Sequence, residues 1–571
     1  MIYEPLSQLP LPANSLLSYA FDNPTYDQDK PIYIDAQSPS QSISCNQARR
    51  KVRQLIKGLR KAGLQNGDCV AVHSLNNIHY SIIVLAIIGS GGIFTGTNPT
   101  YTSTELEHHL KTSQARFVFT ESTGDSLNQL VDCAKQTSIP KQNIWAFDGS
   151  GPSNFHPEIQ SWETLLSHGE EDWIRFDELT TAQSTVAARF FSSGTTGLPK
   201  AVDITHHNLL AQHALVFEAH PRPYRITSLI ALPVFHAAIA PLVHIGTVRS
   251  GYVAYIMRRF DVKNYLKLIE KYNITDLIVV PPIINAILIS DHPGKERCLK
   301  SLRSIVCGAA PLDSNMQSRF GSLLADNIPV TQGWGMTETC CASTMFPYPE
   351  TDETGSVGRL IPNVEAKYAH DLYHLLVTFG INLPKLSRLI DSNLSIVSTP
   401  GSVGELCIRG PTVTPGYFND PSATAGTFLP GNWLRTGDIA RCDPATQKWY
   451  IVGREKELIK VRGFQVAPAE LEAILHSHPG VADAAVVGIK ISASGSEAPR
   501  AFVVRRTGSS VSATEILQYT EQRLARYKWL SGGVKFVDVI PRNASGKILR
   551  RVLRDVDEGG VVSVREVDSK L

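Results

Sequence analysis

Apolar runs of strand length alternate with amphipathic stretches over most of this chain of 571 residues, from about residue 45 to residue 450. Examples of these runs are residues 69–72, 117–119, 186–191, 229–232, 277–280 and 305–307. Such alternation is typical of βαβ units, in which helices cover a mostly parallel sheet. Because the chain is too long for one ordinary core, the pattern predicts a large layered α/β domain with several subdomains.

The pattern changes after about Gly453. A charged stretch, GREKELIKVRGFQVAPAELEAIL, precedes a compact segment with strand-like runs at 484–487 and 501–504. Roughly a hundred residues suit a small separate domain. We therefore predict one domain over residues 1–453 and a smaller α+β domain over residues 454–571.

One segment fits poorly into this division. Residues 368–390, YAHDLYHLLVTFGINLPKLSRLI, are apolar and interrupt a stretch that otherwise resembles β-structure, from 364 to 409. Two interpretations remain open: an ordinary insertion with a short helix, or a translated intron or gene-model error, since its removal joins two strand-like halves. Sequencing the mature transcript distinguishes them.

Composition excludes several classes of protein. Lys and Arg total 55 against 53 Asp and Glu, so the bulk charge predicts no nucleic-acid partner. The apolar stretches at 82–94 and 277–289 are interrupted by glycines or prolines and are shorter than the roughly 20 residues of a membrane span, so we expect buried core segments. The 9 cysteines contain no CxxC pair, and we expect reduced, mostly buried thiols.

A glycine-rich segment, FFSSGTTGLPK at 190–200, carries hydroxyls and one lysine. Backbone amides freed by glycines, hydroxyls and an ammonium group together form a site for phosphate oxygens. It is not the common P-loop, because two residues separate Gly194 from Gly197 and Pro199 precedes Lys200. Taken alone, the segment is equally compatible with a flexible turn.

Further blocks follow along the chain. They are TQGWGMTE at 331–338, GYFNDPSAT at 416–424, WLRTGD at 433–438, EKELIKVRGFQV at 455–466 and PRNASGK at 541–547. With the glycine-rich segment they resemble, in order and content, the adenylate-forming superfamily of acyl-CoA ligases, peptide-synthetase adenylation domains and beetle luciferases. The 4-coumarate:CoA ligase and luciferase branch is most similar. The resemblance covers roughly residues 44–551 and implies a large α/β domain with a small, mobile C-terminal domain.

The resemblance implies a site for ATP and AMP. Its residues are Ser192, Ser193, Gly194, Thr195, Thr196, Lys200, Gln332, Gly333, Thr337, Asp438, Arg454, Lys456, Lys460 and Lys547. In this site the backbone of Gln332 and Gly333 borders the adenine, and Asp438 accepts hydrogen bonds from both ribose hydroxyls. Lys456 is the residue about which the smaller domain pivots. Glu338, a hard oxygen ligand, holds Mg²⁺ against the phosphates.

The implied reaction has two steps. ATP and a carboxylic acid form an acyl-adenylate with release of pyrophosphate, and coenzyme A then displaces AMP. The catalytic residues implied are Lys547, Lys460, His236, Thr337 and Glu338, with Lys547 acting in adenylation and Lys460 in thioester formation after the smaller domain rotates. His236 is expected beside the carboxylate, although a packed core histidine is the alternative.

Three residues are expected to meet coenzyme A: Arg259, Arg462 and Gly463. Arg462 stands where the family usually has lysine, which preserves the charge, and Ala201 stands where a glycine usually follows the loop lysine. Around the acid, we expect residues 307–311, Trp334 and residues 340–342. None carries a charge, which favours an apolar or aryl acid over an amino acid.

Three alternatives remain open. A peptide-synthetase module should be followed by a carrier domain, whereas luciferase-type oxidation shares these motifs. A catalytically impaired nucleotide-binding homologue is the third. The tripeptide Ser569-Lys570-Leu571 matches the address read by the peroxisomal import receptor, so we expect a peroxisomal acyl-CoA ligase.

Overall fold

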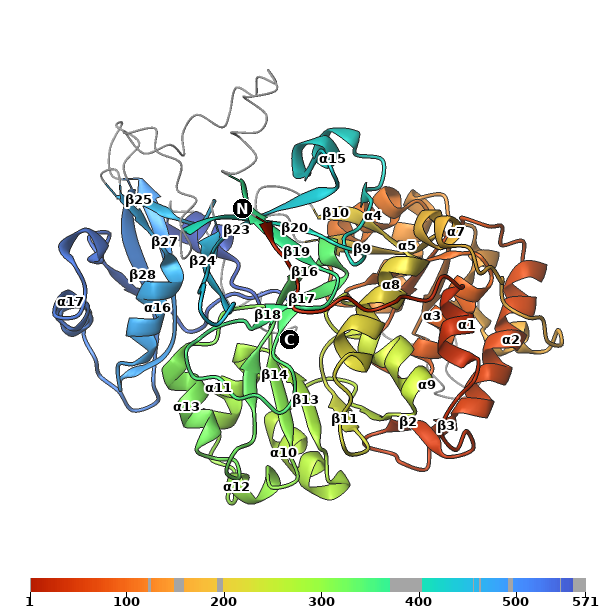
Figure 1. Cartoon of the computed structure of the whole chain (residues 1–571), viewed down its shortest axis with the longest axis horizontal. Helices are drawn as coiled ribbons and strands as arrows, with labels where there is room; N and C mark the ends of the chain where they lie inside the picture. The colour runs from red at the N-terminus through yellow and green to blue at the C-terminus, as the bar shows by residue number, and fades with distance from the viewer. Residues whose placement is uncertain are drawn as a thin grey trace.

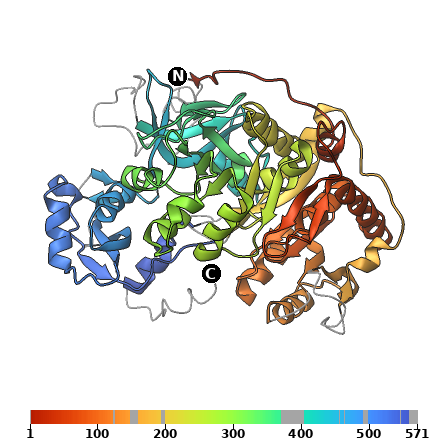
Figure 2. The ribbon, with the colours of Figure 1, turned by 90° about the horizontal axis from the view of Figure 1, so that it is seen from below.

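The computed structural model describes residues 2–121, 125–147, 159–192, 199–369, 403–454, 456–461, 464–490, 497–544 and 546–557. Figure 1 shows a large body of sheets and helices and, beside it, a smaller unit formed by the C-terminal segment. Figure 2 shows the same two parts from below. The predicted α/β class with a smaller C-terminal unit is confirmed. Apart from Tyr368 and Ala369, the unusual segment at 368–390 lies outside the described residues.

Two large sheets form the main body. In the described part of the chain, the first has eight strands in the order β21 (Gly416–Tyr417), β10 (Lys200–Thr205), β9 (Val186–Ser192), β5 (Ile93–Thr97), β4 (Cys69–His73), β6 (Ala115–Thr120), β7 (Ile144–Ala146) and β8 (Gln160–Ser161). From β9 to β8 all neighbours are parallel. The β9–β10 pair is antiparallel and frames the glycine-rich segment.

The second sheet has seven strands among the described residues. Their order is β15 (Val330–Gln332), β14 (Ser304–Cys307), β13 (Asp276–Val279), β11 (Thr227–Ile230), β12 (Val253–Ile256), β2 (Pro31–Asp35) and β3 (Ser42–Ser44). All neighbours except β2 and β3 are parallel. The expected strand at 229–232 is displaced by two residues, since β11 ends at Ile230, before Pro233.

Antiparallel strands complete the body. The larger group comprises β1 (Ile2–Tyr3), β19 (Glu365–Tyr368), β20 (Val403–Arg409), β23 (Trp433–Cys442), β22 (Phe428–Leu429) and β24 (Trp449–Arg454). The smaller comprises β16 (Trp334–Met336), β17 (Cys341–Met345) and β18 (Arg359–Leu360). Trp334 and Asp438 therefore come from neighbouring antiparallel layers, a placement that matters for the site below.

The helices that cover the sheets follow ordinary rules of burial and capping. Every residue of α3 (Tyr80–Gly89) is buried, which confirms that the apolar stretch starting at Ile82 is a core segment. The longer α2 (Cys45–Lys61) has one buried face, and Ser44 and Gln47 form a capping box at its start. No described helix is long and apolar enough to cross a bilayer. All nine cysteines are free thiols, and eight of them are buried.

The smaller unit has its own hydrophobic core. Its elements are β25 (Ile459–Val461), β26 (Phe464–Val466), α16 (Pro468–His476), β27 (Val481–Lys490), β28 (Glu497–Arg505), α17 (Ala513–Glu521), β29 (Val534–Phe536) and α18 (Arg550–Asp557). Leu471, Val486 and Val503 are among its fully buried side chains. It meets the main body through His476, whose Nδ1 lies 3.8 Å from Asp313 Oδ2, and through Asn285, which donates to the Ala482 carbonyl at 3.4 Å.

Several neutral histidines lie in the core of the main body. Burial lowers the pKa of His73, His206, His213 and His244 to about 4, and that of His109 to about 3. Their ring nitrogens bond to neutral partners: His73 to Thr97, His213 to Tyr19 and His244 to Ser81. Protonation would place a cation in each of these buried sites, which burial disfavours.

We predict that the free energy of unfolding falls as the pH drops from about 6.5 towards 4. In the unfolded chain these histidines bind protons at their ordinary pKa of about 6.5, whereas in the folded chain they stay neutral down to about pH 4. Their contribution to the free energy of unfolding is therefore fully present above pH 6.5 and is lost as the pH falls below it. Urea unfolding midpoints at a series of pH values test this. His73→Gln should reduce the pH dependence, while His168→Gln, at an exposed position, should leave it unchanged. A midpoint that is constant between pH 7 and 5 would contradict the prediction.

Candidate active site

A cavity of about 700 Å³ lies between the main body and the smaller unit. Nine of the residues predicted to act in catalysis or to bind ATP line it: Ser192, Lys200, His236, Gly333, Thr337, Glu338, Arg454, Lys456 and Lys547. They come from positions up to 355 residues apart in the chain, as Ser192 and Lys547 show. Ser193, Gly194, Thr195 and Thr196 lie outside the described residues, as do Arg462 and Gly463.

Lys200 and Glu338 lie at the polar end of the cavity. Lys200 begins β10 directly opposite Ser192, the last residue of β9, so this register fixes both ends of the glycine-rich segment. The Lys200 ammonium lies 4.8 Å from the centre of the Tyr417 ring, and the Tyr417 hydroxyl donates to Glu338 Oε1 at 2.9 Å. One aromatic side chain therefore orients both the cation and the carboxylate.

Tyr417 belongs to the block GYFNDPSAT, but its role is not evident from the sequence. Its importance arises from β21, which pairs with β10 at the edge of the eight-stranded sheet and brings residue 417 beside Lys200. In the sequence, the only indication of this role is that the aromatic residue lies within one of the blocks shared with the family.

Asp438 lies just behind the cavity wall and is almost fully buried. Its Oδ1 lies 3.0 Å from Arg454 Nε, and its Oδ2 accepts a 2.8 Å bond from the Trp334 indole. Burial raises the pKa of Asp438, while Arg454 and Trp334 oppose that rise. The carboxylate thus orients Arg454 and Trp334, both of which line the cavity.

Gln332 is turned away from the cavity. Its side chain accepts a 2.8 Å bond from the Leu312 amide and donates to the Leu312 carbonyl at 3.0 Å. This pairing holds the loop that follows β14, while the next residue, Gly333, lines the cavity. The side chain of Gln332 therefore supports the wall, although its backbone adjoins it.

Lys547 enters the cavity from the smaller unit. Its amide donates to Asn543 Oδ1 at 2.8 Å, which closes the loop that carries it. Gly546 has a φ of +81°, and a Cβ there would lie 3.2 Å from Pro282 of the main body, so glycine permits this close approach. Burial, with a smaller contribution from Arg454, lowers the pKa of Lys547 to about 8, while Glu457 and Asp438 oppose the fall.

Lys460 and Arg259 lie elsewhere. Lys460 is exposed on β25, where its amide donates to Glu497 Oε2 at 2.9 Å, and Arg259 is exposed beyond the end of β12. Neither lines the cavity. The pose therefore presents Lys547, rather than Lys460, to a bound ligand.

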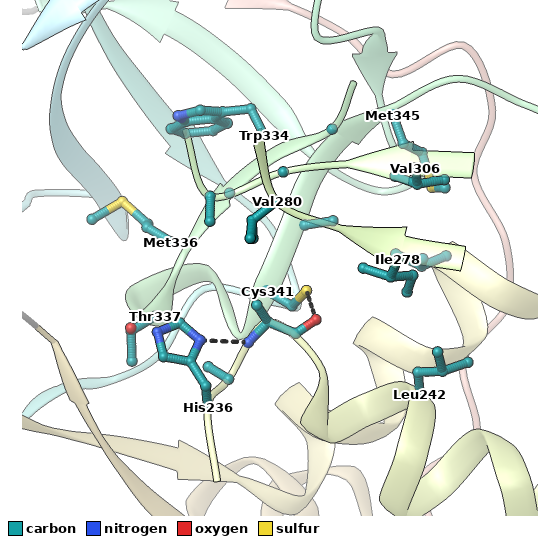
Figure 3. A pocket seen from close by; sticks show the side chains of 18 of the residues that line it. His236, Leu242, Ile278, Val280, Val306, Trp334, Met336, Thr337, Cys341 and Met345 are labelled. Carbon is teal, nitrogen blue, oxygen red and sulfur yellow. Dashed lines mark hydrogen bonds between the residues drawn. The ribbon is translucent and has the colours of Figure 1, made fainter. Parts of the chain in front are cut away.

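His236 lies where the polar and apolar parts of the cavity meet. Figure 3 shows its ring beside Thr337, with one ring nitrogen joined to the backbone of the following segment. That nitrogen, Nδ1, accepts a 3.2 Å bond from the Ala238 amide. Because burial lowers the pKa of His236 to about 4, the ring is neutral at pH 7 and its proton lies on Nε2. His236 can therefore donate one hydrogen bond to a carboxylate oxygen.

The part of the cavity next to His236 is apolar. Figure 3 shows Leu242, Ile278, Val306 and Met345 on the side away from His236 and Thr337. Of the expected lining residues, Gly308, Ala309, Trp334, Cys341 and Ala342 line the cavity. Cys307, Ala310, Pro311 and Cys340 do not, and both of these cysteines are buried outside it. For Cys307 the reason is the period of two along β14, which turns alternate side chains to opposite faces.

The sequence also matches known protein families. The pattern described as "AMP-binding enzyme" matches residues 21–418, and "AMP-binding enzyme C-terminal domain" matches residues 470–547. The chain belongs to the family of AMP-binding enzymes. The resemblance on which the sequence interpretation rested is thereby confirmed.

Two curated relatives of this AMP-binding enzyme come from Aspergillus niger. Phenylacetyl-CoA ligase epaB is 48% identical, with 97% of this chain and 99% of the relative covered. Acyl-CoA ligase azaF is 47% identical, with 97% and 100% covered. Among solved structures, ATP-bound MatB from Rhodopseudomonas palustris has the same fold, with a TM-score of 0.80, 24% identity, and 96% and 99% covered.

We predict that Lys547 sets an alkaline limit on pyrophosphate release. The cation is present below about pH 8 and is lost as the pH rises through that value, so kcat/KM for ATP should fall there. Lys547→Arg keeps a cation at higher pH and should move the fall upwards, whatever its effect on the maximum. Pyrophosphate release measured from pH 6.5 to 9.5 tests this, with Lys460→Arg as the control that should keep the wild-type profile. An unchanged alkaline fall in Lys547→Arg would contradict the assignment.

Proposed function

We propose that this AMP-binding enzyme activates a carboxylic acid with ATP and transfers the acyl group to coenzyme A, with release of AMP and pyrophosphate. The observation that carries the proposal is the continuity of one cavity. One end holds Lys200, Glu338 and Lys547, the apolar middle is suited to an acyl chain, and His236 lies between these two parts. The two relatives from Aspergillus niger are named as a phenylacetyl-CoA ligase and an acyl-CoA ligase.

Charge compensation is the first requirement of the reaction. An acid and ATP both carry negative charge, and bringing them together in a largely buried cavity is costly unless cations lie close by. Lys200, Arg454 and Lys547 all line the cavity. They would stabilise the phosphates and, in the case of Lys547, the charge that develops at the α-phosphate.

Mg²⁺ fits the chemistry of the same region. Glu338 supplies a hard oxygen that Tyr417 orients, and Mg²⁺ in such sites is bound through one or two carboxylates together with substrate phosphates. When bound, Mg²⁺ supplies further neutralisation of the phosphate oxygens. Thr337, next to Glu338 on the cavity wall, adds a hydroxyl.

In the first step, a carboxylate oxygen attacks the α-phosphorus. The new P–O bond forms as the bond to the bridging oxygen breaks, and pyrophosphate leaves with the electron pair. The Nε2 proton of His236 would orient the carboxylate without transferring to it, because a ring with a pKa of about 4 stays neutral at pH 7. This is positioning rather than acid–base catalysis.

In the second step, the thiol sulfur of coenzyme A attacks the acyl carbon. The C–S bond forms, the C–O bond to AMP breaks, and the thiol proton is lost to solvent. We infer that the smaller unit rotates between the steps, so that Lys460 and Arg462 replace Lys547. The exposure of Lys460 in this pose supports that inference, since the same lysine is free to serve another arrangement.

The middle of the cavity suits an acid with an apolar or aryl body. Leu232, Leu242, Ile278 and Val306 supply the middle of the cavity without a charge. Phenylacetate, named for one relative, is therefore a suitable first member of a substrate panel.

The proposal is tested with variants that each block one half-reaction, either adenylate formation or thioester formation. Lys547→Ala should abolish pyrophosphate release yet form thioester from a synthetic acyl-adenylate and coenzyme A. Lys460→Ala should show the reverse pattern, which makes each variant the control for the other. Wild-type protein that releases no pyrophosphate with any acid of a broad panel would overturn the proposal, and equal loss of both steps in Lys547→Ala would overturn the division of roles.

We also propose that the protein acts in peroxisomes. The support is the sequence Ser569-Lys570-Leu571, which the import receptor reads only at an extreme C-terminus. A fluorescent protein fused to the N-terminus should give punctate fluorescence that coincides with a peroxisomal marker. Deletion of Leu571 should make the signal diffuse, and unchanged puncta after that deletion would contradict the proposal.

A further inference from the structure

The acyl part of the cavity follows one face of the seven-stranded sheet. Asp276, Ile278 and Val280 alternate along β13 and its continuation, and Ser304, Val306 and Gly308 alternate along and after β14, and all six line the cavity. Figure 3 shows Val280, Ile278 and Val306 on this wall. From Val280 to Asp276 the strand rises by about 13 Å at the usual 3.3 Å per residue. The cavity therefore reaches from the reacting end to the amino ends of the strands.

The far end of this cavity is polar. Arg222, Ser228, Asp276 and Ser304 line it, although the middle of the cavity is apolar. The Arg222 and Asp276 side chains are only 15% and 14% exposed. Charged groups so nearly buried are costly unless they are well paired or serve a ligand.

The pairing at this end is incomplete. Arg222 Nε lies 3.5 Å from Asp276 Oδ1, Arg222 also donates to Ser304 Oγ at 3.4 Å, and the Tyr224 hydroxyl donates to Asp276 Oδ1 at 3.2 Å. All three distances exceed the usual range for strong charge-assisted bonds. Asp276 Oδ2 is buried and accepts no hydrogen bond from the described residues.

The two opposite charges restrict which ligand group suits them. A second carboxylate would be repelled by Asp276, and an ammonium group would be repelled by Arg222. A neutral hydroxyl can accept a bond from Arg222 and donate one to Asp276, so it satisfies both. An apolar chain end would satisfy neither and would leave both further from water.

We propose that Arg222, Asp276 and Ser304 form a specificity site for a hydroxyl at the far end of the acid, where Asp276 lies about 13 Å along the strand from Val280. This inference rests on the proposed function and names the class of acid: a hydroxy acid with an apolar middle. The hydroxyl group takes no part in the reaction. It determines which acids are held with the carboxylate beside His236.

Matched acids test the inference. A series of straight-chain ω-hydroxy acids, from about six to about fourteen carbons, is compared with methyl-terminated acids of the same lengths, through kcat/KM for CoA-dependent AMP release. At the length that reaches Asp276, the hydroxy acid should be favoured by about tenfold or more, because its methyl analogue leaves buried polar groups unpaired. Shorter acids should show no such preference.

Variants separate recognition from folding. In Asp276→Ala combined with Arg222→Met, the preference should fall to about twofold or less, while kcat/KM for butyrate, which is too short to reach the site, stays at the wild-type value. Arg303→Met is the matched control: Arg303 lies 4.8 Å from the Tyr224 ring in the same cluster but does not line the cavity. It should keep the wild-type preference.

Three results would overturn the inference. The first is a wild-type enzyme that treats hydroxy and methyl acids alike at every length. The second is an equal loss of butyrate and long-acid activity in the double variant, which would show a structural role only. The third is a preference that survives the double variant. Absence of AMP release with butyrate and all other acids in the wild type would instead defeat the proposed function, and this inference with it.

Discussion

The ion pair between Asp438 and Arg454 is the contact on which the site depends. It lies where β23 pairs with β24, the strand from which the chain leaves the main body for the smaller unit. A buried pair of this kind contributes little net stability, but removal of either partner leaves an uncompensated charge. The same two residues set the electrostatic surroundings of Lys547, together with Glu457. Arg550 in turn pairs with Glu457 at 3.0 Å, so the network extends into α18.

The cavity combines two environments that are rarely compatible. Phosphates require cations and hydrogen-bond donors, whereas an acyl chain or ring requires an apolar surface. The structure separates them: Lys200, Glu338 and Lys547 lie at one end of the cavity, and the apolar residues lie along the strand faces in its middle. His236 stands at the boundary, where a neutral donor serves a carboxylate better than an imidazolium that would have to be buried.

The sequence predicted the fold class and most strands because alternation of apolar runs reports burial directly. It also predicted which motif residues meet, since Lys200, Glu338, Arg454 and Lys547 lie in recognisable blocks and line one cavity. The direction of individual side chains was harder: Cys307 was expected in the cavity, but the register of β14 turns it away. Arg222 and Asp276 had no local signal, because their proximity arises from a loop before β11 meeting the start of β13.

Gly546 illustrates how a contact in one pose constrains the others. A Cβ at Gly546 would lie 3.2 Å from Pro282, tighter than ordinary van der Waals contact, so a side chain there would displace the proline slightly. A side chain at this position would therefore disfavour the pose in which Lys547 lines the cavity. Because the proposed second step requires the smaller unit to leave this pose, the absence of a side chain at Gly546 affects both how firmly Lys547 is held and how readily it withdraws.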